Sequence, residues 1–152
     1  APGEAPESAD HVVPIGRAAV LREGGDVTLV SYAKTVGACL GAADALAERG
    51  IHAEVIDLRT LKPLDEKAIL RSVRKTGRLV VVHEANRLCG VGAEVSAIVS
   101  EHAFDALKAP VRRLAGPDAP AASSWALEQA AVPNADAVRD AVLAIVGERA
   151  AA

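Results

Sequence analysis

Aromatic side chains are almost absent from this 152-residue sequence, which has one tyrosine, one phenylalanine, one tryptophan and no methionine. Hydrophobic residues nevertheless make up 51% of the chain, so the core has to be built from valine, leucine, isoleucine and alanine. Cores of this kind suit helices packed in layers on a sheet. A chain of this length fits one ordinary domain.

Other absences exclude whole classes of protein. No apolar run approaches the roughly 18 residues that a membrane helix needs, and acidic residues stand at the N-terminus where a signal peptide carries positive charge. The two cysteines, Cys39 and Cys89, lack the spacing of a metal site, and a formal charge of −3 with scattered basic residues gives no support to nucleic-acid binding. We therefore expect a reduced, cytoplasmic protein that binds neither membranes nor nucleic acid. Because the chain begins with alanine, we also expect it to be a piece of something longer.

Turn residues and apolar periodicity predict alternating strands and helices. Residues 1–17 combine proline, glycine, glutamate and serine without an apolar period, which predicts a linker or arm before a domain at 18–148. Gly24 and Gly25 predict a hairpin between the first two strands, and Trp125 is expected to anchor a short helical turn. The expected elements are strands at 18–23, 26–31, 52–58, 79–83 and 111–114, and helices at 33–49, 63–77, 93–107, 124–130 and 134–146.

This order of elements predicts an α/β fold with three layers. The sheet should be mostly parallel, with about five strands of which one is antiparallel, and with helices on both faces. Functional groups in such sheets gather at the carboxyl ends of the strands. The stretch HEANRLCGVGAE, residues 83–94, lies at one of these ends and is the main candidate site.

Several kinds of chemistry can be weighed at this stretch. His83 and Glu84 are adjacent, so on a strand they point to opposite faces, which is awkward for an acid/base pair. A histidine held by local hydrogen bonds is the alternative. Gly90 and Gly92 resemble part of a phosphate-binding loop, yet a full GxGxxG is absent and a plain strand-to-helix turn explains them as well. Cys89 precedes a helix, as reactive thiols often do, or is a structural thiol.

The other candidates are isolated. Arg59, in DLRTLKPLD, follows a strand and either pins its own loop or contacts another subunit. The remaining histidines, at positions 11, 52 and 102, stand alone in the sequence. We predict no catalytic, cofactor-binding or metal-binding residue within this chain.

Four stretches resemble a known family. They are VPIGRAAVLREGGDVTLVSYAKTV at 13–36, IHAEVIDLRTLKPLDEKAILRSVRKTGRLVVVHEANRLCGVGAEV at 51–95, APVRRLAGPDAP at 109–120 and VPNADAVRDAV at 132–142. Together they are similar to the C-terminal, transketolase-type domain of the beta subunit in the first component of 2-oxoacid dehydrogenases, the pyruvate and branched-chain enzymes.

The resemblance implies a role in assembly. The whole enzyme would use thiamine diphosphate and magnesium, which this domain alone is not expected to bind. The implied partners are an alpha subunit and a second beta subunit in an alpha2beta2 assembly, together with a dihydrolipoyl acyltransferase component. The candidate subunit or partner contacts are Arg59, His83, Glu84, Arg87, Gly92 and Asp118.

Two residues differ from the pattern of this family, and two other identities are possible for the domain. Asn86 stands where relatives often have proline, and Lys108 where acidic residues are common. Both weaken the assignment of any particular partner contact. The domain could instead belong to a transketolase or a deoxyxylulose-phosphate synthase. A stand-alone module that binds a small anion at residues 90–94 is the second alternative.

Overall fold

The computed structural model describes residues 12–120 and 123–147. Most of the predicted linker therefore lies outside the described residues, as does His11, and the domain range 18–148 stays a prediction. The elements are β1 (Ala19–Arg22), β2 (Val27–Ser31), α1 (Thr35–Ala47), β3 (Ala53–Asp57), α2 (Glu66–Thr76), β4 (Leu79–Asn86), α3 (Val91–His102), η1 (Phe104–Ala106), β5 (Arg112–Gly116), α4 (Trp125–Ala131) and α5 (Ala135–Val146).

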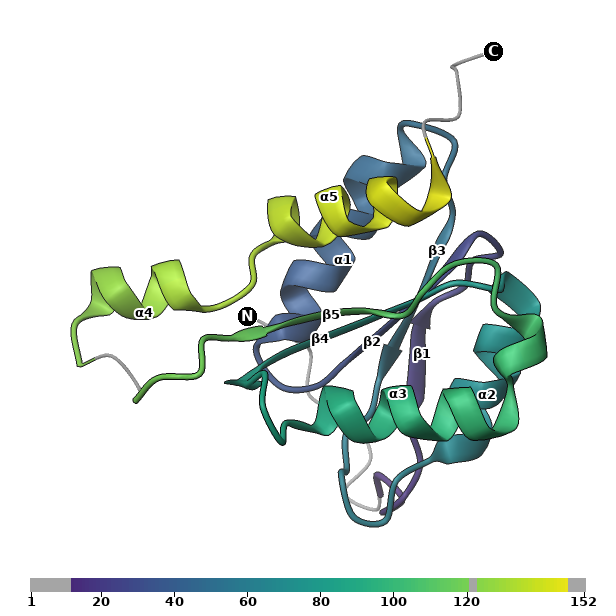
Figure 1. The fold of residues 1–152 in the computed structure, drawn as a ribbon, viewed down its shortest axis with the longest axis horizontal. Helices are drawn as coiled ribbons and strands as arrows, with labels where there is room; N and C mark the ends of the chain where they lie inside the picture. Colours follow the sequence, from purple (N-terminus) through teal and green to yellow (C-terminus); the bar gives the residue numbers. More distant parts are fainter. Residues whose placement is uncertain (1–11, 121–122, 148–152) are drawn as a thin grey trace.

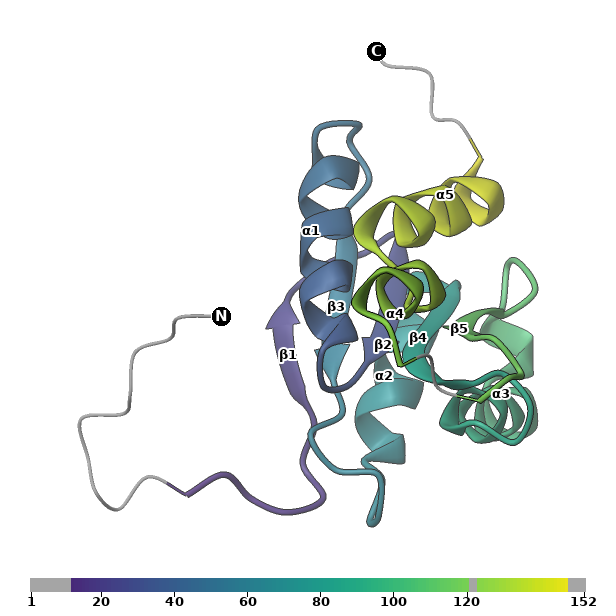
Figure 2. The same cartoon turned by 90° about the vertical axis from the view of Figure 1, so that its left-hand side faces the viewer.

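The predicted three-layer α/β fold is confirmed. The five strands lie in the order β1-β3-β2-β4-β5, in which β1 runs antiparallel to β3 and the other pairings are parallel (Figure 1). Helices α1 and α5 cover one face, and α2 and α3 cover the other (Figure 2). Strands β2 and β4 lie inside the sheet and are buried on both faces, which explains their unbroken apolar runs.

The predicted hairpin between the first two strands is wrong, because β3 lies between them. Gly24 and Gly25 do form the turn, but the amides of Gly25 and Asp26 donate to the His52 carbonyl at the start of β3, at 3.1 and 3.0 Å. A Cβ on Gly24 would lie 2.3 Å from the carbonyl carbon of Ala53. Glycine is therefore needed here for close approach to a third strand rather than for a two-strand turn.

Helix α2 begins and ends at clear signals. The Asp65 side chain accepts from the amide of Ala68 at 3.2 Å, and Gly77 ends the helix in the left-handed region with φ 75°. Asp65 also accepts from the amide of Ala18 at 3.0 Å. One carboxylate thus starts the helix and fixes the entry of the chain into β1.

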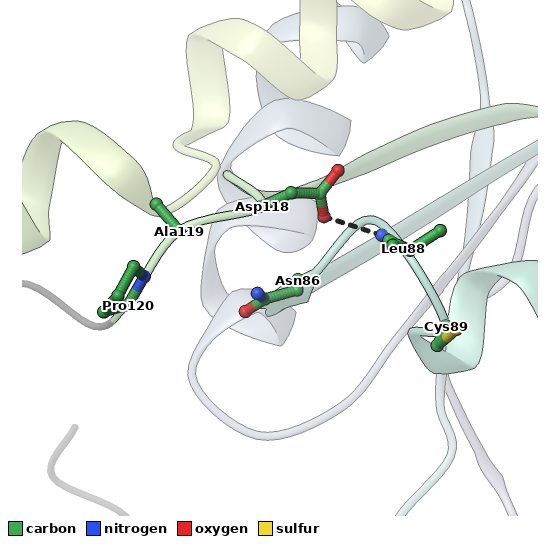
Figure 3. Close-up of a pocket in the computed structure, with 6 residues that line it drawn as sticks. All are labelled: Asn86, Leu88, Cys89, Asp118, Ala119 and Pro120. Carbon is green, nitrogen blue, oxygen red and sulfur yellow. Dashed lines mark hydrogen bonds between the residues drawn. The ribbon is translucent and has the colours of Figure 1, made fainter.

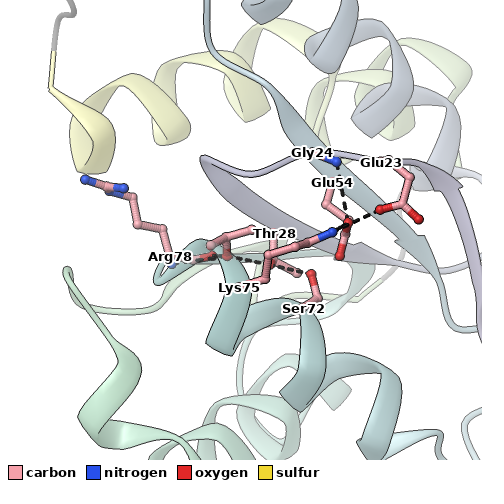
Figure 4. Close-up of polar contacts among 8 residues, drawn as sticks. Glu23, Gly24, Thr28, Glu54, Ser72, Lys75 and Arg78 are labelled. Atoms are coloured by element: carbon pink, nitrogen blue, oxygen red, sulfur yellow. Dashed lines mark hydrogen bonds and ion pairs between the residues drawn. The ribbon is translucent and has the colours of Figure 1, made fainter.

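A polar network fills the space between α2 and the sheet (Figure 4). The Thr28 hydroxyl lies 2.7 Å from that of Ser72 and 2.8 Å from that of Thr76. Beside it, the buried carboxylate of Glu54 forms an ion pair with Lys75, which also lies 2.9 Å from Glu23. The buried polar groups are therefore satisfied within the network.

The chain after β4 differs from the prediction at α3 and at α4. Helix α3 starts earlier than expected, at Val91, and a short 3-10 turn follows its end at His102. Trp125 does not anchor its segment, since its side chain is 76% exposed. No residue of α4 is buried, and the helix projects beyond the carboxyl ends of the strands (Figure 1). The apolar residues of this segment therefore find no core within the described part of the chain.

Candidate functional site

His83 lies near the end of β4 and is completely buried. Its Nδ1 lies 3.1 Å from the Ala85 carbonyl, and its Nε2 accepts from the amide of Gly92 at 3.2 Å. Since Nε2 accepts, the ring is neutral and Nδ1 carries the proton that is donated to Ala85. The interpretation of a histidine held by local hydrogen bonds is confirmed, and the ring presents no surface to a partner.

The environment of His83 favours this neutral form. Burial lowers the pKa of His83, and the nearby charge of Arg113 lowers it further, while the hydrogen bond to Ala85 opposes the change. The N-terminus of α3, where the Gly92 amide lies, adds positive potential at the same point. His83 is therefore a fixed structural link between β4 and α3.

The glycines of the turn accommodate the histidine ring. A Cβ on Gly92 would lie 2.6 Å from Nε2 of His83, and one on Gly90 would lie 2.7 Å from Cε1. The His83 ring lies against both glycines and accepts from the amide of Gly92, one of the groups that a bound anion would use. These contacts favour a plain strand-to-helix turn over a small-anion site at residues 90–94.

Two arginines fasten the loop after β4 to β5. The Arg87 guanidinium donates to the Arg113 carbonyl at 3.1 Å, and the Arg113 guanidinium donates to the Arg87 carbonyl at 3.2 Å. Asp118 adds a third link, because its carboxylate accepts from the amide of Leu88 at 2.7 Å (Figure 3). The loops that follow β4 and β5 are thereby held as one unit.

Glu84 is half-buried beside the fully buried His83 on β4, where adjacent residues point to opposite faces of the sheet. Its charge, after the effect of burial, raises the pKa of Tyr32, whose ring stacks on His83 with centroids 6.2 Å apart. No hydrogen bond joins Glu84 to His83 in the described residues. The pair cannot act as a directly coupled acid and base in this arrangement.

Two open cavities adjoin the joined loops. One, of about 500 Å³, is lined by Leu88, Cys89 and Asp118, among others. The other, of about 620 Å³, extends from Glu84 to Leu127 on α4. They share three lining residues, Asn86, Ala119 and Pro120, and so lie side by side at the carboxyl ends of β4 and β5.

The structure separates Arg59 from the other candidates. Arg59 follows β3 with φ 57°, an uncommon conformation for a residue with a side chain, and its amide donates to Asp57 at 3.0 Å. Strand β2 lies between β3 and β4, so Arg59 is exposed at another part of the edge. His83, Glu84, Arg87, Gly92 and Asp118 do come together.

The two cysteines differ in setting. Burial raises the pKa of Cys39 to about 12, which makes it an inert core thiol. Cys89 is exposed in the turn before α3. Within residues 12–120 and 123–147, no cluster of three or more histidine, cysteine, aspartate or glutamate side chains is placed to hold a metal ion.

Sequence reasoning missed two contributors to this site. Arg113 lies on an ordinary strand, and only the paired carbonyl contacts reveal its role. Tyr32 lies after β2 and reaches His83 because β2 and β4 are neighbours. The strand order would have been needed to find it.

Comparison with known proteins identifies the fold family. A family model described as "Transketolase, C-terminal domain" matches residues 16–138. Among solved structures, a split-gene transketolase described as an inactive beta4 tetramer shares 32% identity with a TM-score of 0.80, covering 94% of this chain and 46% of that one. A transketolase of Pichia stipitis, 16% identical with a TM-score of 0.58 over 85% of this chain and 18% of its own, shares the fold.

Comparison with curated proteins indicates which members of the family are similar to this chain. The beta subunit of acetoin:2,6-dichlorophenolindophenol oxidoreductase of Bacillus subtilis is 43% identical over 97% of this chain and 43% of its own length. The mitochondrial pyruvate dehydrogenase E1 beta subunit of Dictyostelium discoideum is 49% identical over 81% of this chain and 35% of its own. The 2-oxoisovalerate dehydrogenase beta subunit of Bacillus subtilis is 48% identical over 78% of this chain and 36% of its own length.

The chain therefore spans less than half the length of these relatives. None of its described helices has the length and apolar character to cross a membrane. With a family model that covers most of the chain and beta subunits that match along it, this chain belongs to the transketolase C-terminal domain family, and similar proteins include beta subunits of pyruvate dehydrogenase, 2-oxoisovalerate dehydrogenase and acetoin:2,6-dichlorophenolindophenol oxidoreductase.

Proposed function

We propose that this chain is the assembly and partner-contact domain of a beta subunit in a thiamine-diphosphate-dependent 2-oxoacid dehydrogenase, inactive when alone. The observation that carries the proposal is the state of His83, whose two ring nitrogens are both engaged with the backbone. The one buried histidine at the carboxyl edge among the described residues is thus committed to holding a loop. Around it, the loops after β4 and β5 present a fixed surface.

The whole enzyme would oxidatively decarboxylate a 2-oxoacid and pass the acyl group to a lipoyl arm. Thiamine diphosphate with magnesium would supply the decarboxylation chemistry there. At residues 90–94 the His83 ring lies against the two glycines and already takes the Gly92 amide, which supports a domain that does not itself hold the diphosphate. Its contribution is to position other subunits.

The partners we propose are an alpha subunit, a second beta subunit and the acyltransferase component. Contacts would come from exposed side chains of the carboxyl edge, namely Arg59, Arg87 and Asp118, with Glu84 beside them. Gly92 and His83 are buried and would contribute indirectly, because the hydrogen bond between them holds the loop that carries the exposed contacts. The similar split-gene transketolase, an inactive beta4 tetramer, supports both association and the lack of activity.

Two questions about the family remain proposals. The curated beta subunits, at 43–49% identity, are more similar to this chain than the split-gene transketolase at 32%, which favours a 2-oxoacid dehydrogenase over a transketolase or deoxyxylulose-phosphate synthase. The cytoplasmic location is also a proposal, and four of the similar proteins are described as mitochondrial.

A domain exchange tests the proposal. This chain would replace the matching region of the Bacillus subtilis acetoin enzyme beta subunit, which would then be expressed with its alpha subunit. We expect the hybrid to copurify with the alpha subunit and to reduce dichlorophenolindophenol with acetoin as the electron donor, whereas the chain alone, given thiamine diphosphate, magnesium and either acetoin or a 2-oxoacid, shows no turnover. Activity of the chain alone, or a folded hybrid that does not bind the alpha subunit, would contradict the proposal.

A matched pair of substitutions locates the contact. Arg87→Glu, at the carboxyl edge, should weaken copurification, while Arg71→Glu, at an exposed position of helix α2, should not. Equal effects of the two changes would remove the carboxyl edge from the proposal.

A further inference from the structure

Helix α4 is held to the rest of the domain by its flanking chain and one ion pair. None of its seven residues is buried, and the hydrogen bonds of its backbone and its cap run within residues 124–132. In the described part of the chain, the only polar contact between α4 and another element joins Glu128 to Lys34, with Oε1 and Nζ 3.3 Å apart. The position of α4 therefore depends on two half-exposed side chains.

Lys34 occupies a position that disfavours lysine locally. It is the N-cap of the 13-residue helix α1, where the helix dipole opposes a positive charge and where serine, threonine, aspartate or asparagine is preferred. Its side chain makes no capping bond, and the first turn of α1 contains no acidic residue. A residue that breaks a local rule usually has its compensating contact elsewhere, and here that contact is Glu128 on α4.

Glu128 suits both of the helices that it joins. It lies in the first turn of α4, where the helix dipole favours a carboxylate, and it brings negative charge to the start of α1, whose first turn has none. The side chains of Lys34 and Glu128 are 49% and 51% exposed, so water and salt reach both of them. Exposed ion pairs are weak and are screened by salt, so this link can open while the domain stays folded.

The same ion pair bears on the larger cavity at the carboxyl edge. Leu127 and other residues of α4 form one part of the wall of this cavity of about 620 Å³, and Glu84 and Pro117, on and after the strands, form another part. Because α4 has no buried side chain that would keep it in place, the release of Glu128 from Lys34 frees this part of the wall. The shape of the cavity therefore depends on the ion pair.

We propose that Lys34 and Glu128 form a salt-sensitive latch. When the latch is closed, it holds α4 against the start of α1 and keeps the cavity formed. When it is open, α4 is released and the cavity loses part of its wall. Lys34 is thus a positioning residue for α4. The use of this device, to regulate the surface that the carboxyl edge presents, rests on the proposed assembly role.

Chymotrypsin measures the latch and supplies its own reference. Trp125 and Leu127 are cleavage sites in α4, whereas Phe104, which is 73% exposed, is a site on η1. The ratio of the initial cleavage rates in α4 and at Phe104, followed by mass spectrometry, corrects for changes in the protease. Between about 0.01 M and about 1 M salt the Debye length falls from about 30 Å to about 3 Å. We expect the ratio to rise about twofold to fivefold, as suits an exposed ion pair.

A second measurement follows α4 without protease. Trp125 is the only tryptophan in the sequence, so the fluorescence anisotropy of tryptophan reports on α4 alone. We expect the anisotropy to fall over the same range of salt in which the cleavage ratio rises, because a released helix reorients faster than the domain.

A charge-reversal pair separates the latch from the general effects of salt. Lys34→Glu and Glu128→Lys each bring like charges together, so each should raise the cleavage ratio about twofold or more at low salt and abolish its rise with salt. The double variant has opposite charges in exchanged places, and it should lower the ratio again and restore the rise. Lys67→Glu, at an exposed position of α2, is the control and should leave the ratio unchanged.

A cleavage ratio and an anisotropy that do not respond to salt would overturn the proposal. The same holds for single variants that match the original chain, and for a double variant that opens as readily as the single variants. Circular dichroism and cleavage at Phe104 show whether each variant is folded. Failure of the latch leaves the domain-exchange test untouched, since that test measures binding of the alpha subunit.

Discussion

The amide of Gly92 donates to Nε2 of His83 across 3.2 Å, and this bond joins the end of β4 to the first turn of α3. It also determines the chemistry of the histidine, because a nitrogen that accepts a hydrogen bond at a helix N-terminus resists protonation. The residue that looked most like a catalyst in the sequence is thereby made a structural one.

Removing the histidine should destabilise the domain. His83→Ala takes away a buried ring and two hydrogen bonds, so we expect a loss of about 2–4 kcal/mol in the free energy of unfolding, measured with urea. His52→Ala, at an exposed position, is the control and should change little. A loss below about 1 kcal/mol for His83→Ala would mean that the loop is held by other groups.

His83 should also make stability depend on pH. Its pKa in the folded state is lowered below the ordinary value of 6.5, so between these two values the unfolded chain binds a proton that the folded chain does not. The free energy of unfolding should therefore fall as pH drops below about 6.5. The same titration of His83→Ala should lack this part of the slope, and identical slopes would contradict the assignment.

Gly92→Ala tests the close approach of helix and ring. The new Cβ would lie 2.6 Å from Nε2 of His83, so we expect destabilisation of about 1–3 kcal/mol. Gly37→Ala, in α1 with no atom within 4 Å of the new Cβ, should instead stabilise by about 0.5–1 kcal/mol. Combined with His83→Ala, the Gly92 change should cost less than it does alone.

Neighbouring glycines test the corrected strand order. Gly24→Ala places a Cβ 2.3 Å from backbone atoms of Ala53, which cannot move aside, and we expect a loss of more than about 2 kcal/mol. Gly25→Ala meets no atom within 4 Å and should change stability by less than about 0.5 kcal/mol. Equal effects in thermal unfolding would argue against the contact with β3.

Glu54 should govern stability in acid. Burial raises the pKa of this carboxyl, but hydrogen bonds from Lys75 and Ser72 outweigh that effect and leave it lowered. Its contribution is therefore complete above the unfolded pKa of about 4.3 and is lost as pH falls through the lower folded value. Glu54→Gln should cost about 1–3 kcal/mol at pH 7, with the difference from the original chain shrinking below pH 4.

Local patterns predicted the layers of this fold well and its non-local contacts poorly. The valine run of β4 predicts a buried parallel strand. Asp65 and Gly77 predict the two ends of α2 to within about two residues. Gly24 and Gly25 predict a turn, but nothing nearby in sequence reveals that β3 enters between the strands they join.

The candidate site shows the same division. The stretch at 83–94 was found because it follows a buried strand, whereas Arg113 was not, since a guanidinium bound to a carbonyl 26 residues away leaves no periodic pattern. Trp125 is predicted to anchor its segment, yet it is 76% exposed. Sequence alone does not say whether such a residue is covered by its own chain or by another molecule.

The position of β1 also bears on the order in which the chain can fold during synthesis. Its partner β3 ends at Asp57, so β1 has no strand to pair with until the ribosome has released α1 and β3. A nascent chain that stops before Asp57 would carry β1 as an unsatisfied edge. Proteolysis of arrested chains should therefore cut at β1 in short nascent forms and spare it once β3 has emerged.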